Sequence, residues 1–316
     1  MGYEESLTYL YGLERLGVRL GLENVLDLLD RLGNPHETFP SVHVAGSKGK
    51  GSVCAFLDAI LRKAGYRVGL YTSPHLVRFN ERIRVDGETI SDADVVRLAE
   101  AIRPHAEAMR ARGEAFQPTF FEFTTALAFR YFQERAVDIA VVEVGMGGRL
   151  DATNVLRPLV AVITHIEREH TQYLGKTVRR IAREKAGIVK EGVPLWTVDQ
   201  EALGVIARRC EEVGAPLQVV GRDLRLERVA NGHEGQTFTL GDGERRTYRI
   251  PLLGIYQPEN AALAYGALRS LEGAGWTVGR RAIREGFGTT DWPARFEVVS
   301  YAPTVVVDST HTPDGA

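Results

Sequence analysis

Apolar and polar residues follow one another along the chain in blocks that predict buried strands and helices in turn. Compact apolar runs, typical of strands covered on both faces, begin at residue 42 and cover 67–71, 139–144, 160–164 and 194–198. Helical patterns cover 3–16, 22–32, 53–64, 92–112, 119–135, 176–189, 201–213 and 258–271. Strands that alternate with helices indicate an α/β protein with a doubly wound, mostly parallel sheet.

The pattern changes near residues 236–250, where two short runs flank Gly-Asp-Gly and predict a β-hairpin. A linker is predicted at 291–293, and a new strand at 305–308 follows it. A small α/β domain usually takes roughly 100–150 residues, which is far more than the chain has left after this linker. We therefore expect one domain at 1–293 and the incomplete start of a second domain at 294–316.

The composition excludes some classes of partner. With 316 residues, of which 44% are hydrophobic and 25% charged, the chain is typical of a globular protein with a substantial core. The net charge of −2 gives no basic field for nucleic acid, and no apolar run approaches the length of a membrane span. Cys54 and Cys210 lack metal-ligand spacing. We expect a monomer in the cytoplasm that binds neither nucleic acid nor a membrane.

A glycine-rich turn follows the first strand, leads into a helical run and predicts a phosphate-binding loop at residues 45–52. Glycines let the backbone N–H groups turn inward, and the N-terminus of the next helix adds its positive dipole end. Lys50 can reach the outer phosphates of a nucleotide, and the Ser52 hydroxyl can bind a metal that the nucleotide carries. The strict motif is not met, since Val44 replaces its first glycine and Gly51 shifts the hydroxyl residue by one place. A tight bend with a surface lysine is the alternative, but the flanking strand and helix favour nucleotide binding.

Polar residues also follow later strands, at the edge where ligands bind in open α/β sheets. Glu143 ends an apolar strand and is well placed to hold Mg²⁺, while a pair with Arg149 is the alternative. His170 closes a loop with a second histidine and two carboxylates, which suits contact with a metal or phosphate, although a surface histidine is equally expected. Asp308 and His311 form a similar pair after the last predicted strand.

Two further segments leave their roles open. Lys185 lies on a predicted amphipathic helix, and residue types alone favour a solvated lysine that pairs with a nearby glutamate such as Glu184. The loop 72–83 mixes hydroxyl, cationic and amide side chains, which suits a polar substrate or a metal. A well-anchored structural loop is the alternative for this segment.

Several of these segments together resemble the folylpolyglutamate synthase/dihydrofolate synthase family of the Mur ligase superfamily, whose members make amide bonds with ATP. They are Ala-Gly-Ser-Lys-Gly-Lys-Gly-Ser at 45–52, Thr-Ser-Pro-His-Leu at 72–76 with Asn-Glu-Arg-Ile at 80–83, Glu-Val-Gly-Met-Gly-Gly-Arg-Leu-Asp-Ala-Thr-Asn at 143–154, His-Thr-Gln-Tyr-Leu-Gly at 170–175, Arg-Glu-Lys-Ala-Gly-Ile at 183–188 and Gln-Pro-Glu-Asn-Ala-Ala at 257–262. The resemblance covers essentially the whole chain and accounts for the irregular loop, since this superfamily uses a G-x-x-G-K-G-[ST] form. It implies an ATP-binding central domain of Mur ligase type at 1–293 and the start of a Rossmann-like C-terminal ligase domain at 294–316.

The resemblance also implies a phosphate site and two Mg²⁺ sites. The residues that would hold the β- and γ-phosphates are Gly49, Lys50, Gly51 and Ser52. Ser52 would also bind the first Mg²⁺. Glu143 would bridge the two metals, and Ser73 and His170 would complete the second site.

The remaining candidates follow from the same resemblance. Lys185 matches a lysine that this family carbamylates with CO₂, which replaces the solvated-lysine interpretation. Asn260 and Arg295 match positions that contact the nucleotide. Asp308 and His311 match a loop that reaches the nucleotide from the second domain.

The implied reaction is ATP-dependent ligation of L-glutamate to the carboxylate of dihydropteroate, of tetrahydrofolate or its polyglutamates, or of both, through an acyl phosphate. Its catalytic residues would be Lys50, Glu143, His170 and Lys185. The chain departs from the family at residues 167–169, Glu-Arg-Glu, where members usually carry Gly-Leu-Asp, and at 308–313, which lack an amide side chain. Two alternatives are a superfamily ligase with a non-folate acceptor and, because the second domain is incomplete, an ATP-binding fragment that does not complete the reaction.

Overall fold

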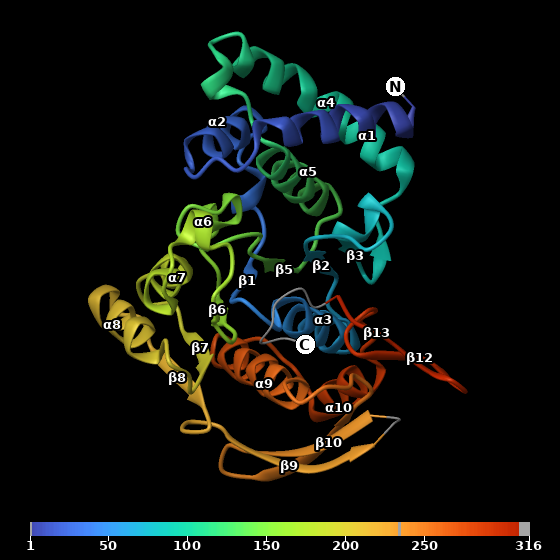
Figure 1. The fold of residues 1–316 in the computed structure, drawn as a ribbon, viewed down its shortest axis with the longest axis vertical. Helices are drawn as coiled ribbons and strands as arrows, with labels where there is room; N and C mark the ends of the chain where they lie inside the picture. Colours follow the sequence, from blue (N-terminus) through green and yellow to red (C-terminus); the bar gives the residue numbers. More distant parts are fainter. Residues whose placement is uncertain (1, 233–234, 310–316) are drawn as a thin grey trace.

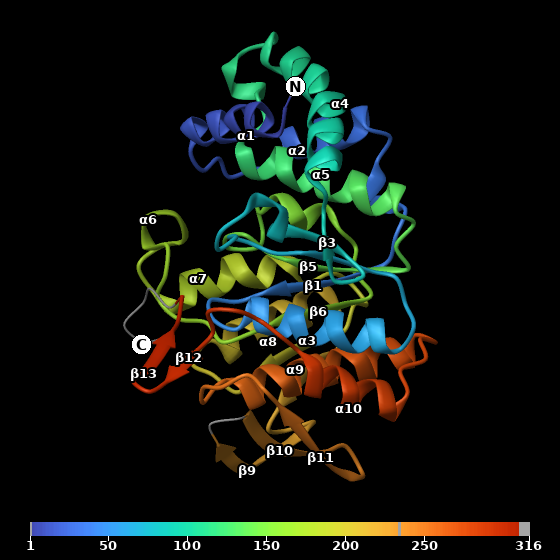
Figure 2. The same ribbon diagram turned by 90° about the vertical axis from the view of Figure 1, so that its right-hand side faces the viewer.

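An eight-stranded sheet runs through the middle of the molecule, with its strands in the order β4-β3-β2-β5-β1-β6-β7-β8 (Figure 1, Figure 2). The computed structural model describes residues 2–232 and 235–309. The strands are β1 (Ser41–Ala45), β2 (Val68–Tyr71), β3 (Ile83–Val85), β4 (Glu88–Thr89), β5 (Ile139–Glu143), β6 (Val160–Ile163), β7 (Leu195–Val198) and β8 (Leu217–Val220). The strands from β2 to β8 in this order pair in parallel, and β3 and β4 pair antiparallel at one edge. The predicted doubly wound, mostly parallel sheet is confirmed.

Helices cover both faces of this sheet. One face carries α3 (Lys50–Lys63), α9 (Gln257–Gly273) and α10 (Arg280–Thr289), and the other carries α5 (Phe120–Glu134), α7 (Val178–Lys185) and α8 (Leu203–Val213). A further layer of α1 (Tyr3–Gly12), α2 (Glu23–Arg31) and α4 (Asp92–Arg110) packs on α5 at the top of Figure 1. The start of α5 is fixed by a capping box, in which Thr119 and Glu122 each accept a hydrogen bond from the other's backbone N–H.

The core of the sheet explains why its strands are continuous apolar runs. Every residue of β1 and β5 is buried, as in parallel sheets with helices on both faces. Val42 and Val44 join the core beneath α3 and α9, whereas Ala45 joins the core on the α7 side, because successive side chains of a strand point to opposite faces. This packing fixes the end of β1 and therefore the loop that follows it.

The C-terminal third adds two small antiparallel sheets. The hairpin predicted at 236–250 is present as β10 (Gly235–Gly241) and β11 (Arg245–Ile250), and β9 (Arg225–Gly232) pairs with β10 as a third strand. The strand predicted at 305–308 corresponds to β13 (Thr304–Val307), which pairs with β12 (Glu297–Tyr301). The domain boundary between residues 293 and 294 stays a prediction.

Several boundaries differ from those that the pattern predicts. The first helix ends at Gly12, and Leu13–Leu16 form a 3₁₀ turn; likewise α7 ends at Lys185 and is followed by a 3₁₀ turn at Ala186–Ile188. The short helix α6 (Thr171–Leu174) directly follows the loop that His170 closes. Within the described ranges, none of the helices has the length and apolar character that crossing a membrane would require.

Candidate active site

The loop between β1 and α3 has the geometry that phosphate binding needs. Gly49, the residue before α3, has a φ of +85°, a left-handed conformation that favours glycine. A Cβ at Gly49 would lie 2.2 Å from the Asn260 Oδ1 atom, so α9 also requires a glycine here. The backbone N–H groups of the first turn of α3 therefore face a tight loop at the positive end of the helix dipole. The predicted strand, glycine-rich turn and helix are confirmed.

Glu143 and Lys50 lie beside each other at the carboxyl ends of β5 and β1. The Lys50 Nζ atom is 4.0 Å from Glu143 Oε1, and the Ser73 backbone N–H donates to Glu143 Oε2 at 3.0 Å. Burial raises the pKa of the Glu143 carboxyl group, and the Lys50 cation opposes this shift. The alternative pair with Arg149 is wrong, since Arg149 instead pairs with Glu184 at 3.1 Å.

These residues line a hollow of about 1070 Å³, here called the P-loop hollow. The predicted site residues on its wall are Gly49, Lys50, Gly51, Ser52, Ser73, Glu143, Asn260, Arg295 and Asp308. The hairpin of β12 and β13 adds Val298 and Val306 to the same wall, so segments far apart in the sequence meet around the phosphate loop. His311 lies outside the described residues.

One wall residue, Trp292, was not among the sequence-based candidates. A Cβ at Gly51 would lie 2.8 Å from the Trp292 Nε1 atom, so the indole packs directly on the phosphate loop. This Nε1 atom is buried without a hydrogen-bond partner among the described residues. Residues 291–293 were predicted to be a linker, because no local sequence pattern reveals that a tryptophan packs on a loop so far away in the chain.

Lys185 is buried rather than solvated, which makes the interpretation from residue types wrong. The side chain is 1% exposed, and its Nζ atom donates to the Gly46 carbonyl at 2.7 Å and to Glu169 Oε1 at 2.6 Å. Burial lowers the pKa of Lys185 to about 8, against the opposing effect of the Glu169 carboxylate. Lys185 thus touches the phosphate loop from behind, outside the residues that line the hollow.

His170 directly follows Glu169, which pairs with Lys185 behind the phosphate loop. It is exposed, has a φ of 44° and directly precedes α6. Of the described residues, the lining of the hollow does not include His170. Nor do three or more histidine, cysteine, aspartate or glutamate side chains gather as a metal site within 2–232 and 235–309.

The donor atoms in the hollow nevertheless fit Mg²⁺ that arrives with a nucleotide. Mg²⁺ prefers oxygen ligands, keeps several waters and is usually bound by one or two carboxylates plus substrate phosphates. Glu143 supplies one buried carboxylate, whose single cationic neighbour within 4.0 Å in the described structure is Lys50. Ser52 and Ser73 supply hydroxyl groups on the same wall. The phosphates of a bound nucleotide would supply the remaining ligands of such a Mg²⁺ site.

Comparison with known proteins places this geometry in a class. The family model of the Mur ligase middle domain matches residues 44–268, which include the phosphate loop, Glu143 and Asn260. The fold is therefore that of a Mur-type ligase, and most of the candidate site lies within the matched residues.

More specific relatives share most of their length with this chain. Folylpolyglutamate synthase of Lacticaseibacillus casei is 38% identical over 100% of this chain and 75% of its own length. Dihydrofolate synthase/folylpolyglutamate synthase of Bacillus subtilis is 40% identical over 99% of this chain and 74% of its own. The chain belongs to the folylpolyglutamate synthase/dihydrofolate synthase family of ATP-dependent ligases, and the resemblance stated from its sequence is confirmed.

Solved structures agree with this assignment. A complex of folylpolyglutamate synthase with AMPPCP superimposes with a TM-score of 0.93 at 38% identity, and covers 100% of this chain and 78% of the solved one. Folylpolyglutamate synthase from Thermotoga maritima superimposes with a TM-score of 0.89 at 40% identity, over 99% of this chain and 72% of that one.

Proposed function

We propose that this chain uses ATP to join L-glutamate to the carboxylate of dihydropteroate or of a reduced folate. The observation that carries the proposal is the P-loop hollow, where Lys50, Glu143 and Ser73 meet at the first turn of α3. One solved relative, at a TM-score of 0.92, is a folylpolyglutamate synthase complex with AMPPCP and folate, which supports both substrates. The cytoplasmic location and the monomeric state stay predictions.

The first step would activate the acceptor. An oxygen of its carboxylate attacks the γ-phosphorus of ATP, and the bond from that phosphorus to the β-phosphate oxygen breaks. The products are ADP and an acyl phosphate of the acceptor. Such transfers are catalysed mainly by positioning and by neutralising charge. The N–H groups at the start of α3 and the Lys50 ammonium group would bind the β- and γ-phosphates, as Gly49, Gly51 and Ser52 shape the loop around them.

Bound Mg²⁺ would neutralise charge on the phosphates during this transfer. Ser52 and Glu143 would hold the first ion, while Ser73 and His170 are the proposed ligands of a second. Asn260, Arg295, Asp308 and His311 stay the proposed nucleotide contacts. The Glu143 carboxylate is held for this task by the Ser73 N–H group and is 5% exposed.

The second step would form the amide. The uncharged amine of L-glutamate attacks the acyl carbon, and the carbon–oxygen bond to phosphate breaks. The nitrogen then releases one proton, which gives the amide and free phosphate. Trp292 and Phe296 give the hollow apolar walls, which favour this attack over hydrolysis because they limit access of water.

Carbamylation of Lys185 is part of the proposal. A pKa of about 8 leaves a larger uncharged fraction at neutral pH than an ordinary lysine has, and the uncharged amine is the form that reacts with CO₂. The product is an anion, so the ion pair with Glu169 must open when it forms. Mass spectrometry of the intact chain with and without bicarbonate tests this modification.

Isotope transfer tests the acyl phosphate. With a heavy oxygen isotope in the acceptor carboxylate, the account predicts one labelled oxygen in the released phosphate for each amide formed. Amide formation with unlabelled phosphate would rule out the intermediate. The Lys50→Ala variant is the control, since it should form neither amide nor labelled phosphate.

A further inference from the structure

Arg82 is a buried cation that has no carboxylate within ion-pair distance among the described residues, although its charge acts on the Glu143 carboxylate from farther away. It is 8% exposed and, across the described ranges, the one arginine in the buried class. No aspartate or glutamate in those ranges forms an ion pair with it. Since a buried charge is costly unless a counter-charge is near, this arrangement indicates an anionic group that arrives with a ligand.

The side chains that touch the Arg82 guanidinium group hold it in place but carry no negative charge. Its Nε atom donates to His75 Nδ1 at 2.8 Å, so that nitrogen of His75 carries no proton. The guanidinium group also lies over the Phe120 ring, 5.2 Å from its centroid. The pair therefore presents one net positive charge and, on His75, a free Nε2–H donor.

The pair lies beside the P-loop hollow but not in it. The neighbours of Arg82 in sequence, Glu81 and Arg84, line the hollow, whereas Arg82 does not. The Arg82 carbonyl accepts from the Thr72 N–H at 3.0 Å, which keeps this segment next to Ser73. Arg82 ends the 3₁₀ turn Phe79–Arg82, and its guanidinium group lies against Phe120 at the start of α5.

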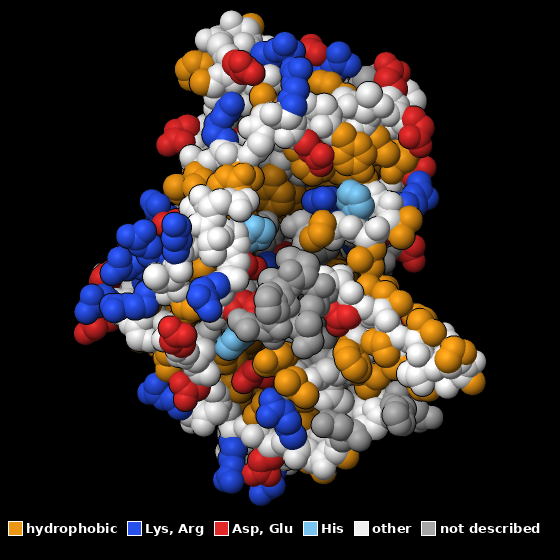
Figure 3. Space-filling model, in the orientation of Figure 1, with side chains coloured by type: hydrophobic (Ala, Val, Ile, Leu, Met, Phe, Trp, Pro, Cys, Tyr) orange, Lys and Arg blue, Asp and Glu red, His pale blue; other side chains and the backbone are white. Residues whose placement is uncertain are grey.

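The side of the pair that faces the helical layer is partly exposed. Tyr11, 37% exposed, stacks on Phe120 with ring centroids 5.8 Å apart and lies 6.4 Å from the His75 ring. Figure 3 shows a hollow at this level between the helical layer and the rest of the molecule, with a histidine beside a lysine or arginine on its wall. Tyr11 and His75, both at least partly exposed, thus lie at the outer side of the buried Arg82.

We propose that Arg82 and His75 bind the α-carboxylate of the glutamate at the end of a folate acceptor. The inference rests on the proposed function. The reacting carboxylate must enter the P-loop hollow to meet the γ-phosphate, so an arginine just outside that hollow is placed for the second carboxylate of the same glutamate. Dihydropteroate has no such carboxylate. The pair would therefore determine how strongly the chain prefers folates over pteroates as acceptors.

Equilibrium binding tests this site without requiring turnover. Titration calorimetry would compare tetrahydrofolate with its analogue in which the α-carboxylate is a carboxamide. We expect the wild-type chain to bind tetrahydrofolate about tenfold to a hundredfold more tightly, the range for hydrogen bonds to a charged group. Arg82→Met should remove this difference by weakening tetrahydrofolate alone, and Arg82→Lys should keep part of it. His75→Gln, at a partly exposed position, should weaken tetrahydrofolate by a smaller factor.

Two outcomes would overturn the site: no preference for tetrahydrofolate in the wild-type chain, or equal weakening of both ligands by Arg82→Met. Arg130→Met is the matched control, because Arg130 lies on α5 in an exposed pair with Glu134 and should leave both dissociation constants unchanged. Turnover separates this site from the proposed function. If the wild-type chain prefers the carboxylate but forms no amide from either acceptor, the ligase proposal fails and the binding site stands.

Discussion

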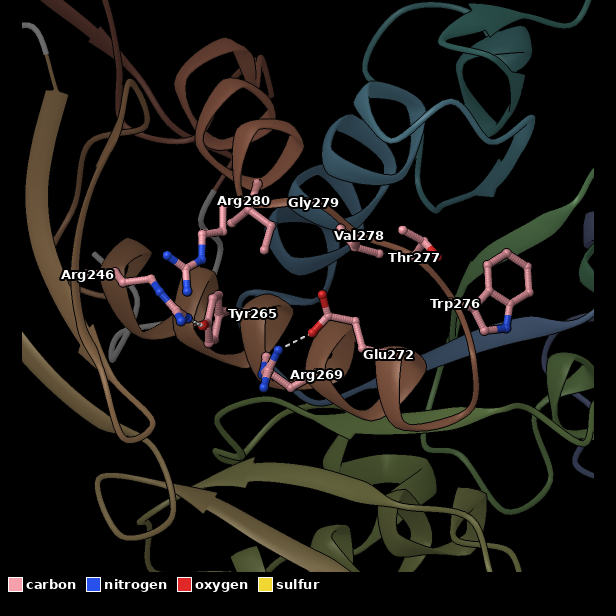
Figure 4. Close-up of a pocket in the computed structure, with 10 residues that line it drawn as sticks. Arg246, Tyr265, Arg269, Glu272, Trp276, Thr277, Val278, Gly279 and Arg280 are labelled. Carbon is pink, nitrogen blue, oxygen red and sulfur yellow. Dashed lines mark hydrogen bonds and ion pairs between the residues drawn. The ribbon is translucent and has the colours of Figure 1, made fainter.

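Two hollows of this chain contain arginines, and they differ in how the charges are paired. The second, about 560 Å³, lies between α9, α10 and β11 and is lined by Arg246, Arg269 and Arg280 (Figure 4). Each of the three has an acidic partner: Arg246 and Arg280 contact Glu244 at 2.8 and 2.9 Å, and Arg269 contacts Asp242 at 3.1 Å. The charges of this arginine hollow are compensated within the protein.

The P-loop hollow is different. Arg84 lies over the Trp292 ring and donates to a backbone carbonyl, and Arg295 donates to the Ala294 carbonyl at 3.0 Å. Neither forms an ion pair with an acid in the described part of the chain. Arginines paired with acidic side chains hold elements of the protein together, whereas arginines without such a pair can bind the negative charges of substrates. The comparison therefore separates a binding site from a structural network that has the same residue types.

The largest expected effect is at Lys50. The Lys50→Ala variant removes the cation nearest to Glu143 and the phosphate loop, and should lower kcat/KM by roughly 10³-fold. Nucleotide titration and initial rates with ATP check this. Unchanged ATP affinity and activity would show that residues 45–52 are not the phosphate-binding loop.

Glu143→Gln should separate activity from stability. We expect kcat to fall by roughly 10²-fold, because the buried carboxylate that would bind the metal is lost. The pKa of Glu143 is raised in the fold, so its protonated form favours folding below the unfolded-state pKa, and this benefit is lost as the pH rises through the folded-state value. At neutral pH the free energy of unfolding should thus stay the same or increase. Urea denaturation measures it, and a clear loss of stability would contradict the account.

Arg246→Met should show the opposite behaviour. This variant removes the contacts of Arg246 with Glu244 at 2.8 Å, with Asp242 at 3.5 Å and with the Tyr265 hydroxyl at 2.7 Å, and should lower the free energy of unfolding by about 1–2 kcal/mol. Its kcat/KM should equal that of the wild-type chain. Loss of activity without loss of stability would show that the arginine hollow also serves a substrate.

The smallest effect is expected for Arg280→Gln, in the same hollow. Arg280 and Glu244 are 73% and 62% exposed, and ion pairs this exposed contribute little because water and salt screen them. Neither the melting temperature nor kcat/KM should change measurably. A clear change in the melting temperature or in kcat/KM would mean that the charge balance of the arginine hollow depends on the Arg280–Glu244 ion pair.

Features with a local cause could be predicted from the sequence. The buried strands β1, β5, β6 and β7 are mostly apolar, and glycines between a strand and a helix indicate the phosphate loop. The pattern did not predict β8, β9 or α10, nor the antiparallel edge of β3 and β4. Short strands at sheet edges are less apolar and are fixed by pairing with neighbours, which leaves a weak local signal.

The site residues show the same limit. Lys185 was read from its residue type as solvated because the groups that bury it, Gly46 and Glu169, come from other segments. Glu184, the partner expected from proximity in sequence, pairs with Arg149 instead. Arg82 lies in the loop 72–83, whose role the residue types left open, and only the fold shows that no described carboxylate lies within ion-pair distance of it. Charge compensation is a tertiary property, and local patterns do not report it.

The most direct test is incubation of the chain with Mg·ATP, L-glutamate and either dihydropteroate or tetrahydrofolate, with mass spectrometry of the pterin products. The account predicts an acceptor that has gained one glutamate, with ADP and phosphate released in equal amounts, and none of these with Lys50→Ala. ATP binding without product from either acceptor would contradict it and would favour an ATP-binding fragment.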